Sequence, residues 1–294
     1  MNHYNGRLLS ACYPHPNFPT ISVTGGSCAL SCKHCNKRYL HGMISCTSPD
    51  VLFTTCTKMA SKGARGILLS GGYNADGFVP FEPFLDAIAR IKSETGLFIS
   101  AHTGIIPGWL ANELGRAGVD QADFDIIGDD ETIKFVTGLD KKVEDYRHSI
   151  RALEKTLPHI APHICVGIHG GQLKGELRAL ELASEINPSV LVLLSFVPTP
   201  GTNFEGIRPA SASEFGKIVA AASAAMPDSE IALGCMRPRQ GRGELELEAL
   251  RAGADRIELP SVVTIRAAEK MGLQVRRLNA CCSIPPELAG DFIA

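Results

Sequence analysis

Apolar runs of strand length alternate with amphipathic segments of helix length along the whole chain of 294 residues. This alternation is the pattern of repeated βα units that build a parallel sheet. Eight runs have the length of a strand, and eight is the number of strands that closes a TIM-type barrel. The predicted strands are 18–24, 66–70, 97–101, 124–127, 163–168, 190–197, 230–233 and 256–259.

Between the predicted strands, apolar residues recur at the helical period of 3.6. The clearest segment is 81–94, where the apolar positions from Phe84 to Ile91 share one face. Ser48 and Pro49 form a helix start, because the hydroxyl can cap the first turn and proline fits its first position. Further helices are predicted at 145–155, 176–186, 213–225, 244–252 and 263–271.

No low-complexity linker or break in composition divides the chain. We therefore predict one α/β domain over 1–294, a (β/α)8 TIM-type barrel with a short N-terminal lead and a C-terminal tail. The lead covers 1–17, the barrel 18–272 and the tail 273–294. Because such barrels carry their chemistry at the C-terminal ends of the strands, we examined the residues that follow each predicted strand.

Composition narrows the class of protein and the compartment. Hydrophobic residues make up 45% and charged residues 20%, which is typical of a globular protein with a sizeable core. The formal net charge is −2 and the cations are scattered, so we expect no nucleic acid and no membrane as a partner. We find no signal peptide and no apolar stretch of spanning length, and expect a cytoplasmic protein. There, ten cysteines indicate metal or redox chemistry rather than disulfides.

Three cysteines with the spacing C-x3-C-x2-C follow the first predicted strand, namely Cys28, Cys32 and Cys35. Three thiolates on one short loop can hold three irons of a [4Fe-4S] cluster and leave the fourth iron open to a ligand. Zinc is the competing interpretation, but zinc sites usually use two C-x2-C pairs or add histidines at fixed offsets. The spacing therefore favours an iron-sulfur cluster with an open iron.

Polar groups at the next strand ends are candidates for ligand binding. Ser70-Gly71-Gly72 follows the second predicted strand, where two glycines let a ligand approach the backbone. His102, after the third, can bond a carboxylate or ribose hydroxyl, or can be a structural histidine. Asp129, after the fourth, can bind a ligand amine or ribose, or can stabilise a helix N-terminus.

The remaining cysteines predict a second group of metal ligands. Cys235 ends the seventh predicted strand, and Cys281 and Cys282 lie in the tail. If the tail folds back over the barrel mouth, these thiols meet, and Cys12 in the lead is the natural fourth ligand of a second cluster. The alternative for each is a reduced thiol in the core. Three isolated cysteines are expected to be core residues: Cys46, Cys56 and Cys165.

The cysteine loop, placed early in the chain after a strand, resembles the radical S-adenosylmethionine (radical SAM) superfamily. This resemblance implies that S-adenosyl-L-methionine (SAM) binds the open iron and is cleaved by one electron to a 5′-deoxyadenosyl radical. It also implies that the Gly71-Gly72 turn contacts the SAM amino group and that Ile168, after the fifth predicted strand, lies against adenine. The chain departs from the superfamily pattern at Tyr73, where glutamate is usual, and at His34, where an aromatic residue is usual.

Longer stretches resemble biotin synthase-related radical SAM proteins, and most closely one subunit of the two-protein lipoyl synthase of archaea and some bacteria. These stretches are 21–25, 39–43, 124–129, 233–238 and 281–283. The resemblance implies a sulfurtransferase that inserts sulfur at an unactivated C–H bond of a protein-bound octanoyl chain, with the second [4Fe-4S] cluster as sulfur donor. Such an apolar chain suits an interior without charged catalytic groups. The implied partners are an octanoylated lipoyl domain or glycine-cleavage carrier protein, a companion radical SAM subunit and an electron donor.

Two alternatives remain open on the sequence. The same barrel could perform another radical SAM reaction, such as carbon-skeleton rearrangement or amino-acid cleavage, which requires no second cluster. The chain could also be a non-catalytic iron-sulfur protein that transfers electrons or has only a structural cluster or zinc ion. The number of irons per chain and the ability to cleave SAM separate these alternatives.

Overall fold

The computed structural model describes residues 6–294. Within them, eleven strands form one all-parallel curled sheet in the order β11-β1-β10-β9-β8-β7-β6-β5-β4-β2-β3. The predicted α/β fold of the TIM type is confirmed, although the edge strands β3 and β11 do not pair with each other. The strands are β1 (Leu8–Cys12), β2 (Thr20–Ser22), β3 (Ile44–Ser45), β4 (Gly66–Ser70), β5 (Phe98–His102), β6 (Gln121–Asp125), β7 (His159–Val166), β8 (Val190–Ser195), β9 (Glu230–Leu233), β10 (Arg256–Glu258) and β11 (Gln274–Leu278).

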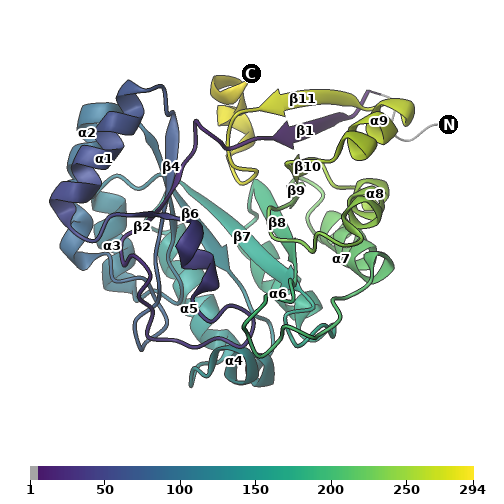
Figure 1. Cartoon of the computed structure of the whole chain (residues 1–294), viewed down its shortest axis with the longest axis horizontal. Coiled ribbons are helices and arrows are strands. Elements are labelled where there is room, and N and C mark those ends of the chain that lie inside the picture. Colours follow the sequence, from purple (N-terminus) through teal and green to yellow (C-terminus); the bar gives the residue numbers. More distant parts are fainter. Residues whose placement is uncertain (1–5) are drawn as a thin grey trace.

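Helices cover the outer face of the sheet, with α1, α2 and α3 on one side and α7, α8 and α9 on the other (Figure 1). The α-helices are α1 (Pro49–Ser61), α2 (Leu85–Thr95), α3 (Gly108–Arg116), α4 (Asp130–Thr137), α5 (Val143–Glu154), α6 (Glu176–Ser184), α7 (Ala212–Ala225), α8 (Arg242–Ala252) and α9 (Val262–Lys270). Three 3-10 helices, η1 (Arg38–Gly42), η2 (Glu82–Phe84) and η3 (Pro286–Phe292), complete the described elements. No described helix has the combination of length and hydropathy that crossing a bilayer requires.

Every predicted strand has a counterpart, but the lead and the tail add β1 and β11, which were not predicted. β1 lies between β10 and β11, so the two ends of the chain complete one edge of the sheet. The helices α3 and α4 were also missed. The predicted helix start is confirmed, since the Ser48 hydroxyl accepts a hydrogen bond from the Val51 amide and Pro49 begins α1.

The two faces of the sheet differ in what they bury. Successive strand residues point to opposite faces, and on β4 and β5 one set, Ile67, Leu69 and Ile99, belongs to the core that the helices cover. The alternate set includes Ser100 and His102 and lines the concave side. The concave side of these strands therefore carries polar side chains beside apolar ones such as Phe98.

The C-terminal tail bridges the gap between the two edges of the sheet, where Figure 1 shows it in yellow between β4 and β11. Its apolar residues Ile284 and Phe292 pack with Phe18 and Phe98, and the Phe18 and Phe292 ring centroids lie 6.2 Å apart. Fully buried Arg256 on β10 donates to the carbonyl oxygens of Cys282 and Ile284 and so fixes the tail. Side-chain packing by the tail, rather than strand pairing, closes this side of the barrel.

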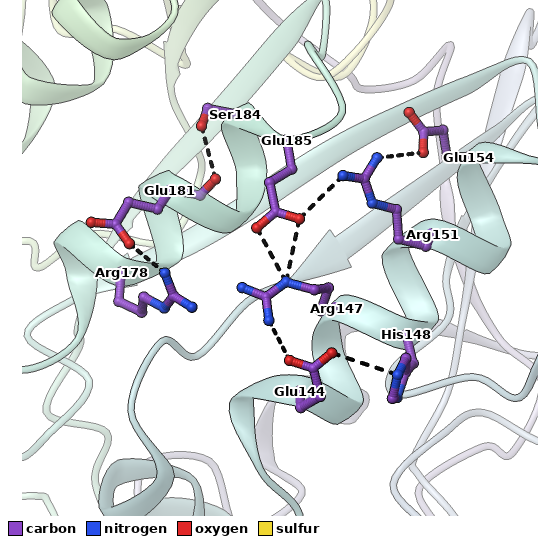
Figure 2. A network of polar contacts seen from close by, with 9 residues as sticks. All are labelled: Glu144, Arg147, His148, Arg151, Glu154, Arg178, Glu181, Ser184 and Glu185. Atoms are coloured by element: carbon purple, nitrogen blue, oxygen red, sulfur yellow. Dashed lines mark hydrogen bonds and ion pairs between the residues drawn. The ribbon is translucent and has the colours of Figure 1, made fainter.

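An ion-pair network lies on the outer surface between α5 and α6 (Figure 2). Arg147 bonds Glu144 on its own helix and Glu185 at the end of α6, and Arg151 also reaches Glu185 at 3.2 Å. These side chains are partly or largely exposed. The network connects two neighbouring helices and lies outside the barrel.

Candidate functional site

The cysteine loop follows β2 and lies directly against the turn after β4. The Ala29 amide donates to the Tyr73 carbonyl at 2.8 Å, and the Gly72 amide donates to the Thr24 hydroxyl at 2.6 Å. A Cβ placed on Gly72 would lie 2.5 Å from Cys28 Cβ and would overlap the Ser27 carbonyl. The second glycine of the predicted turn is therefore required for contact with the cysteine loop.

The helix α4 and the segment after β8 hold the middle of this loop. The Lys33 amide donates to the Val136 carbonyl in α4, and the Phe204 amide, after β8, donates to the Lys33 carbonyl. The Lys33 ammonium lies 3.6 Å from the centroid of the Phe135 ring. Beyond the last cysteine, the Tyr39 hydroxyl bonds the Thr199 hydroxyl at 2.9 Å. The loop is thus fixed by the β6 and β8 sides of the sheet as well as by its own turns.

The three loop cysteines are half-buried and influence one another electrostatically. Burial, together with the charges of Cys35 and Cys28, raises the pKa of Cys32 to about 12. Burial also raises the pKa of Cys35, although backbone amides oppose this. Cys32 and Cys35 therefore resist ionisation until cations compensate the thiolate charge, so a loop that also carries Cys28 fits a metal cluster.

His34 and Asp125 occupy the inner side of this loop. Burial lowers the pKa of His34 to about 4, and its buried Nδ1 atom has no partner among the described residues. Asp125 ends β6, and its charge acts on His34, Tyr73 and Cys165. Its carboxylate forms no hydrogen bond or ion pair within residues 6–294. An unpaired carboxylate beside the cysteine loop is a candidate for ligand binding that the sequence did not reveal.

The predicted SAM contacts have different surroundings. Ser70 Oγ lies 3.5 Å from His102 Nδ1, so the ends of β4 and β5 meet on the concave side. Asp129 instead caps α4, because its carboxylate accepts from the Thr132 amide at 2.8 Å and the Thr132 hydroxyl at 2.6 Å. These bonds occupy Asp129 in the helix cap. Asp125 therefore offers a freer carboxylate at the same end of β6.

Ile168 lies beneath the cysteine loop. It packs in a buried cluster with Val136, Phe196 and Phe204, two of which also bond the loop through their backbones. An apolar surface is therefore present at the predicted position after β7. Its contact with adenine stays a prediction.

The second group of cysteines lies at the opposite edge of the sheet. Cys12 ends β1, Cys235 follows β9, and Cys281 and Cys282 follow β11. Burial raises the pKa of Cys12. The positive charge of Arg256 lowers this pKa, and the charges of Glu258 and Cys281 raise it. The pKa of Cys282 is raised by its hydrogen bond with Cys281, then by burial and by the charges of Glu258, Cys281 and Cys12.

Glu258, at the end of β10, is the centre of this group and was missed in the sequence. One of its oxygens and the sulfurs of Cys281 and Cys282 lie within 4.8 Å of one another. Cys281 Sγ donates to Glu258 Oε2 at 3.7 Å, and the Cys282 amide donates to the same oxygen at 3.3 Å. Cys235 has an exposed side chain, and the charges of Glu258 and Cys281 act on it.

The positive charge of Arg256 favours an anionic ligand at the second group of cysteines. Its buried Nη2 atom has no partner among the described residues, and its charge acts on Cys12. The neighbouring Arg237 is occupied instead: it pairs with Glu246 at 2.9 Å and donates to the Gly234 carbonyl at 2.6 Å. Thiols, a carboxylate and an unsatisfied guanidinium donor fit an anionic, thiolate-bound metal cluster.

The barrel interior corrects one expectation from the sequence. His102, Asp123 and His163 converge on the concave side, from the neighbouring strands β5, β6 and β7. Asp123 therefore places a charged side chain in an interior that was expected to hold no charged catalytic groups. Asp123 was missed because the predicted strand began at Phe124, whereas the polar alternation of Gln121, Asp123 and Asp125 could have revealed it.

Comparisons with known proteins agree with this fold. No protein-family model matches the chain. Biotin synthase of Maricaulis maris is 24% identical over 298 residues, which cover 94% of this chain and 87% of that protein. Biotin synthase of Synechococcus sp. is 23% identical over 248 residues, which cover 81% of this chain and 73% of that protein.

Solved structures extend the comparison. Methylornithine synthase matches with a TM-score of 0.62 at 17% identity, over 92% of this chain and 83% of that chain. SuiB of Streptococcus suis, bound to S-adenosylmethionine, matches with a TM-score of 0.58 at 8% identity, over 78% of this chain and 52% of that chain. The chain is thus similar to biotin synthases along most of its length and has the fold of radical SAM enzymes.

Proposed function

We propose that this chain is a radical SAM sulfurtransferase that inserts sulfur at an unactivated C–H bond of a protein-bound octanoyl chain, in the biosynthesis of the lipoyl cofactor. The radical SAM part rests on the cysteine loop, the fold and the similarity to biotin synthases. The sulfur-inserting part rests on one observation, the second group of cysteines around Glu258. An enzyme that used only the first cluster would have no need of that group.

Cys28, Cys32 and Cys35 would hold the first [4Fe-4S] cluster. When bound, this cluster and SAM supply a 5′-deoxyadenosyl radical that abstracts hydrogen from carbon. Around it, Gly72 allows the β4 turn to meet the loop, Ile168 offers an apolar surface, and Asp125 offers a carboxylate. Ser70, Gly71, His102 and Asp129 stay predicted SAM contacts, with Asp129 already bonded as a helix cap.

Cys12, Cys235, Cys281 and Cys282 would hold the second [4Fe-4S] cluster, which in this proposal is the sulfur-donating substrate. A C–H bond of the octanoyl chain breaks and its hydrogen passes to the adenosyl carbon. A C–S bond then forms to a sulfide of the donor cluster, and the remaining electron reduces iron in that cluster. The Arg256 guanidinium would stabilise the negative charge of the thiolate-bound group.

The partners follow from the substrate. The octanoyl group would arrive on a lysine of a lipoyl domain or of the glycine-cleavage carrier protein. A companion radical SAM subunit would install the other sulfur, and an electron donor would reduce the first cluster. A cytoplasmic location is part of the same proposal.

The test uses anaerobically reconstituted wild type, the Cys28/Cys32/Cys35 triple alanine variant, Cys282→Ala, and Cys46→Ala as a core-cysteine control. We expect two four-iron clusters per wild-type chain and one in the triple variant. Cys282→Ala should cleave SAM but fail to thiolate an octanoyl-lysine peptide, as followed by mass spectrometry. A single cluster in the wild type, or full thiolation by Cys282→Ala, would refute the donor-cluster assignment.

The polar interior favours a second candidate. His102, Asp123 and His163 would suit a small polar substrate, so the alternative is a radical SAM rearrangement or cleavage of an amino-acid-like molecule without a sulfur donor. Retention of one cluster and SAM cleavage, with no thiolated peptide, would favour this candidate.

A further inference from the structure

We propose that His102, Asp123 and His163 form a binding site for a single divalent metal ion inside the barrel, separate from both groups of cysteines, in which His102 is a metal ligand rather than the SAM contact expected from the sequence. One ring nitrogen of each histidine and one oxygen of Asp123 lie within 4.8 Å of one another. Two histidines and one carboxylate are a donor set that suits Fe²⁺ and Zn²⁺ and leaves coordination positions open.

The three side chains converge without bonding one another. Asp123 and His163 are buried, at 1% and 6% exposure, and the two imidazole rings meet edge to face with centroids 5.6 Å apart. Within the described chain, neither histidine forms a hydrogen bond or ion pair with Asp123. Their hydrogen bonds go to other neighbours, so the atoms that converge are not bonded to one another.

The surrounding hydrogen bonds orient these side chains as metal ligands are usually oriented. His163 Nδ1 lies 2.9 Å from the Ala161 carbonyl, and donation to that oxygen leaves the Nε2 lone pair free. Asp123 accepts from the Ser100 hydroxyl at 2.6 Å and from the Gln121 amide at 2.8 Å. These two bonds leave the carboxylate with lone pairs for an ion.

The strand register explains why the three residues meet. His102 on β5 pairs with Asp123 on β6, and His163 on β7 pairs with Asp125, two residues further along β6. All three side chains belong to the set that faces the concave side. The site is therefore built on rigid neighbouring strands, and a bound ion could hold an oxygen atom of a substrate inside the barrel.

One hydrogen-bond chain joins this site to the tail. Gln121 donates to Asp123 and, at 3.0 Å, to the Ser283 hydroxyl, which lies 3.3 Å from Cys281 Sγ. The metal site and the second group of cysteines thus share a positioning residue. The proposal itself stands on the three ligands and does not depend on sulfur insertion.

The test is equilibrium dialysis of the cluster-loaded protein against Zn²⁺, with metal counted by mass spectrometry. We expect one zinc ion per chain beyond the clusters, lost in Asp123→Asn and in His163→Gln. His169→Gln is the matched control, because His169 bonds Thr132 outside this site. Ser100→Ala should weaken zinc binding about tenfold, through loss of the bond that orients Asp123.

X-ray absorption at the zinc edge identifies the ligands independently of activity. Nitrogen and oxygen neighbours without sulfur would support the site, whereas sulfur neighbours would place the zinc on cysteines and overturn it. Equal zinc in the wild type and both ligand variants would also overturn it. Unchanged iron content and circular dichroism confirm that each variant is folded, and His102→Gln replaces any variant that is not.

Discussion

The two groups of cysteines lie toward opposite edges of one sheet and are assembled in different ways. Cys28, Cys32 and Cys35 come from a single loop after β2. The second group comes from the ends of β9, β1 and β11, three of the four strands at the other edge, and Glu258 comes from the fourth, β10. The three loop cysteines are neighbours along the chain even though the β4 turn, α4 and the segment after β8 hold their loop, whereas the second group exists only when the lead, the barrel and the tail are all in place.

This difference predicts that damage at one edge leaves the other edge working. Substitutions beside the loop should affect SAM cleavage, and substitutions that loosen the tail should affect the second group.

Gly72→Ala tests the first edge. The added methyl group would lie 2.5 Å from Cys28 Cβ and would push the loop away from the β4 turn. Because misplacement by about 1 Å can cost about a hundredfold in rate, we expect SAM cleavage to fall by at least that factor. Reductant-dependent 5′-deoxyadenosine formation measures this. Gly26→Ala is the control, since its Cβ would contact nothing, and normal cleavage by Gly72→Ala would contradict the packing argument.

Arg256→Met tests the second edge. It leaves two tail carbonyls without their donor and the partly exposed Glu230 without its cation, and we expect a loss of about 1.5–3 kcal/mol in unfolding free energy. Hydrogen exchange over 279–292 should rise, and iron should fall to that of one cluster while SAM cleavage persists. If the tail stays protected from exchange, Arg256 is not what fixes it.

Glu246 tests the support of the loop that carries Cys235. Burial opposes its ionisation, but bonds from Arg242, Thr264, Ser261 and Arg237 lower its pKa to about 2. A lowered pKa stabilises the fold fully above the ordinary value of 4.5, and this contribution is lost as pH falls toward 2. Glu246→Gln should therefore cost about 2–3 kcal/mol at pH 7, and the difference from wild type should shrink by pH 3. A difference that does not change with pH would show that the charge of Glu246 is not responsible.

Glu185→Gln provides the contrast outside the barrel. Glu185 pairs with Arg147 and Arg151 in the surface network of Figure 2. Exposed ion pairs contribute less than about 1 kcal/mol, so thermal unfolding should change little and both clusters should load normally. Glu181→Gln, which removes a pair within α6 alone, is the matched control. Loss of either cluster in Glu185→Gln would show that the outer surface influences the site.

Local sequence patterns predicted the features that depend only on residues close together in the chain. The spacing of Cys28, Cys32 and Cys35, the glycine turn after β4 and the α1 start at Ser48 are all features of a few consecutive residues. The strands whose outer faces pack against helices were predicted because burial requires apolar residues on that face, and these residues are visible in the sequence. β1 was missed because the lead was placed outside the barrel, and β11 was missed because it carries Arg276 and Arg277 in place of apolar residues.

The alternation of polar and apolar residues also explains why the predicted strand began at Phe124, whereas β6 begins at Gln121. The inward residues of β6 are polar, and the Gln121 side-chain amide donates a hydrogen bond to Asp123. In a hydrophobicity pattern, such polar residues resemble a loop. Asp129 and Asp125 are a further pair whose hydrogen bonds the sequence does not show. Both acids are plausible ligands in the sequence, but Asp129 bonds its own helix start while Asp125 keeps its carboxylate free.

The class of fold and the first cysteine site could be predicted from the chain, because βα periodicity and a three-cysteine spacing are local properties. The folded chain was needed to show that β1 and β11 complete the sheet, that Glu258 joins the tail cysteines, and that two histidines meet Asp123. Those contacts join residues as far apart as Cys12 and Cys282, whose proximity depends on sheet order and register. No short-range pattern contains that information.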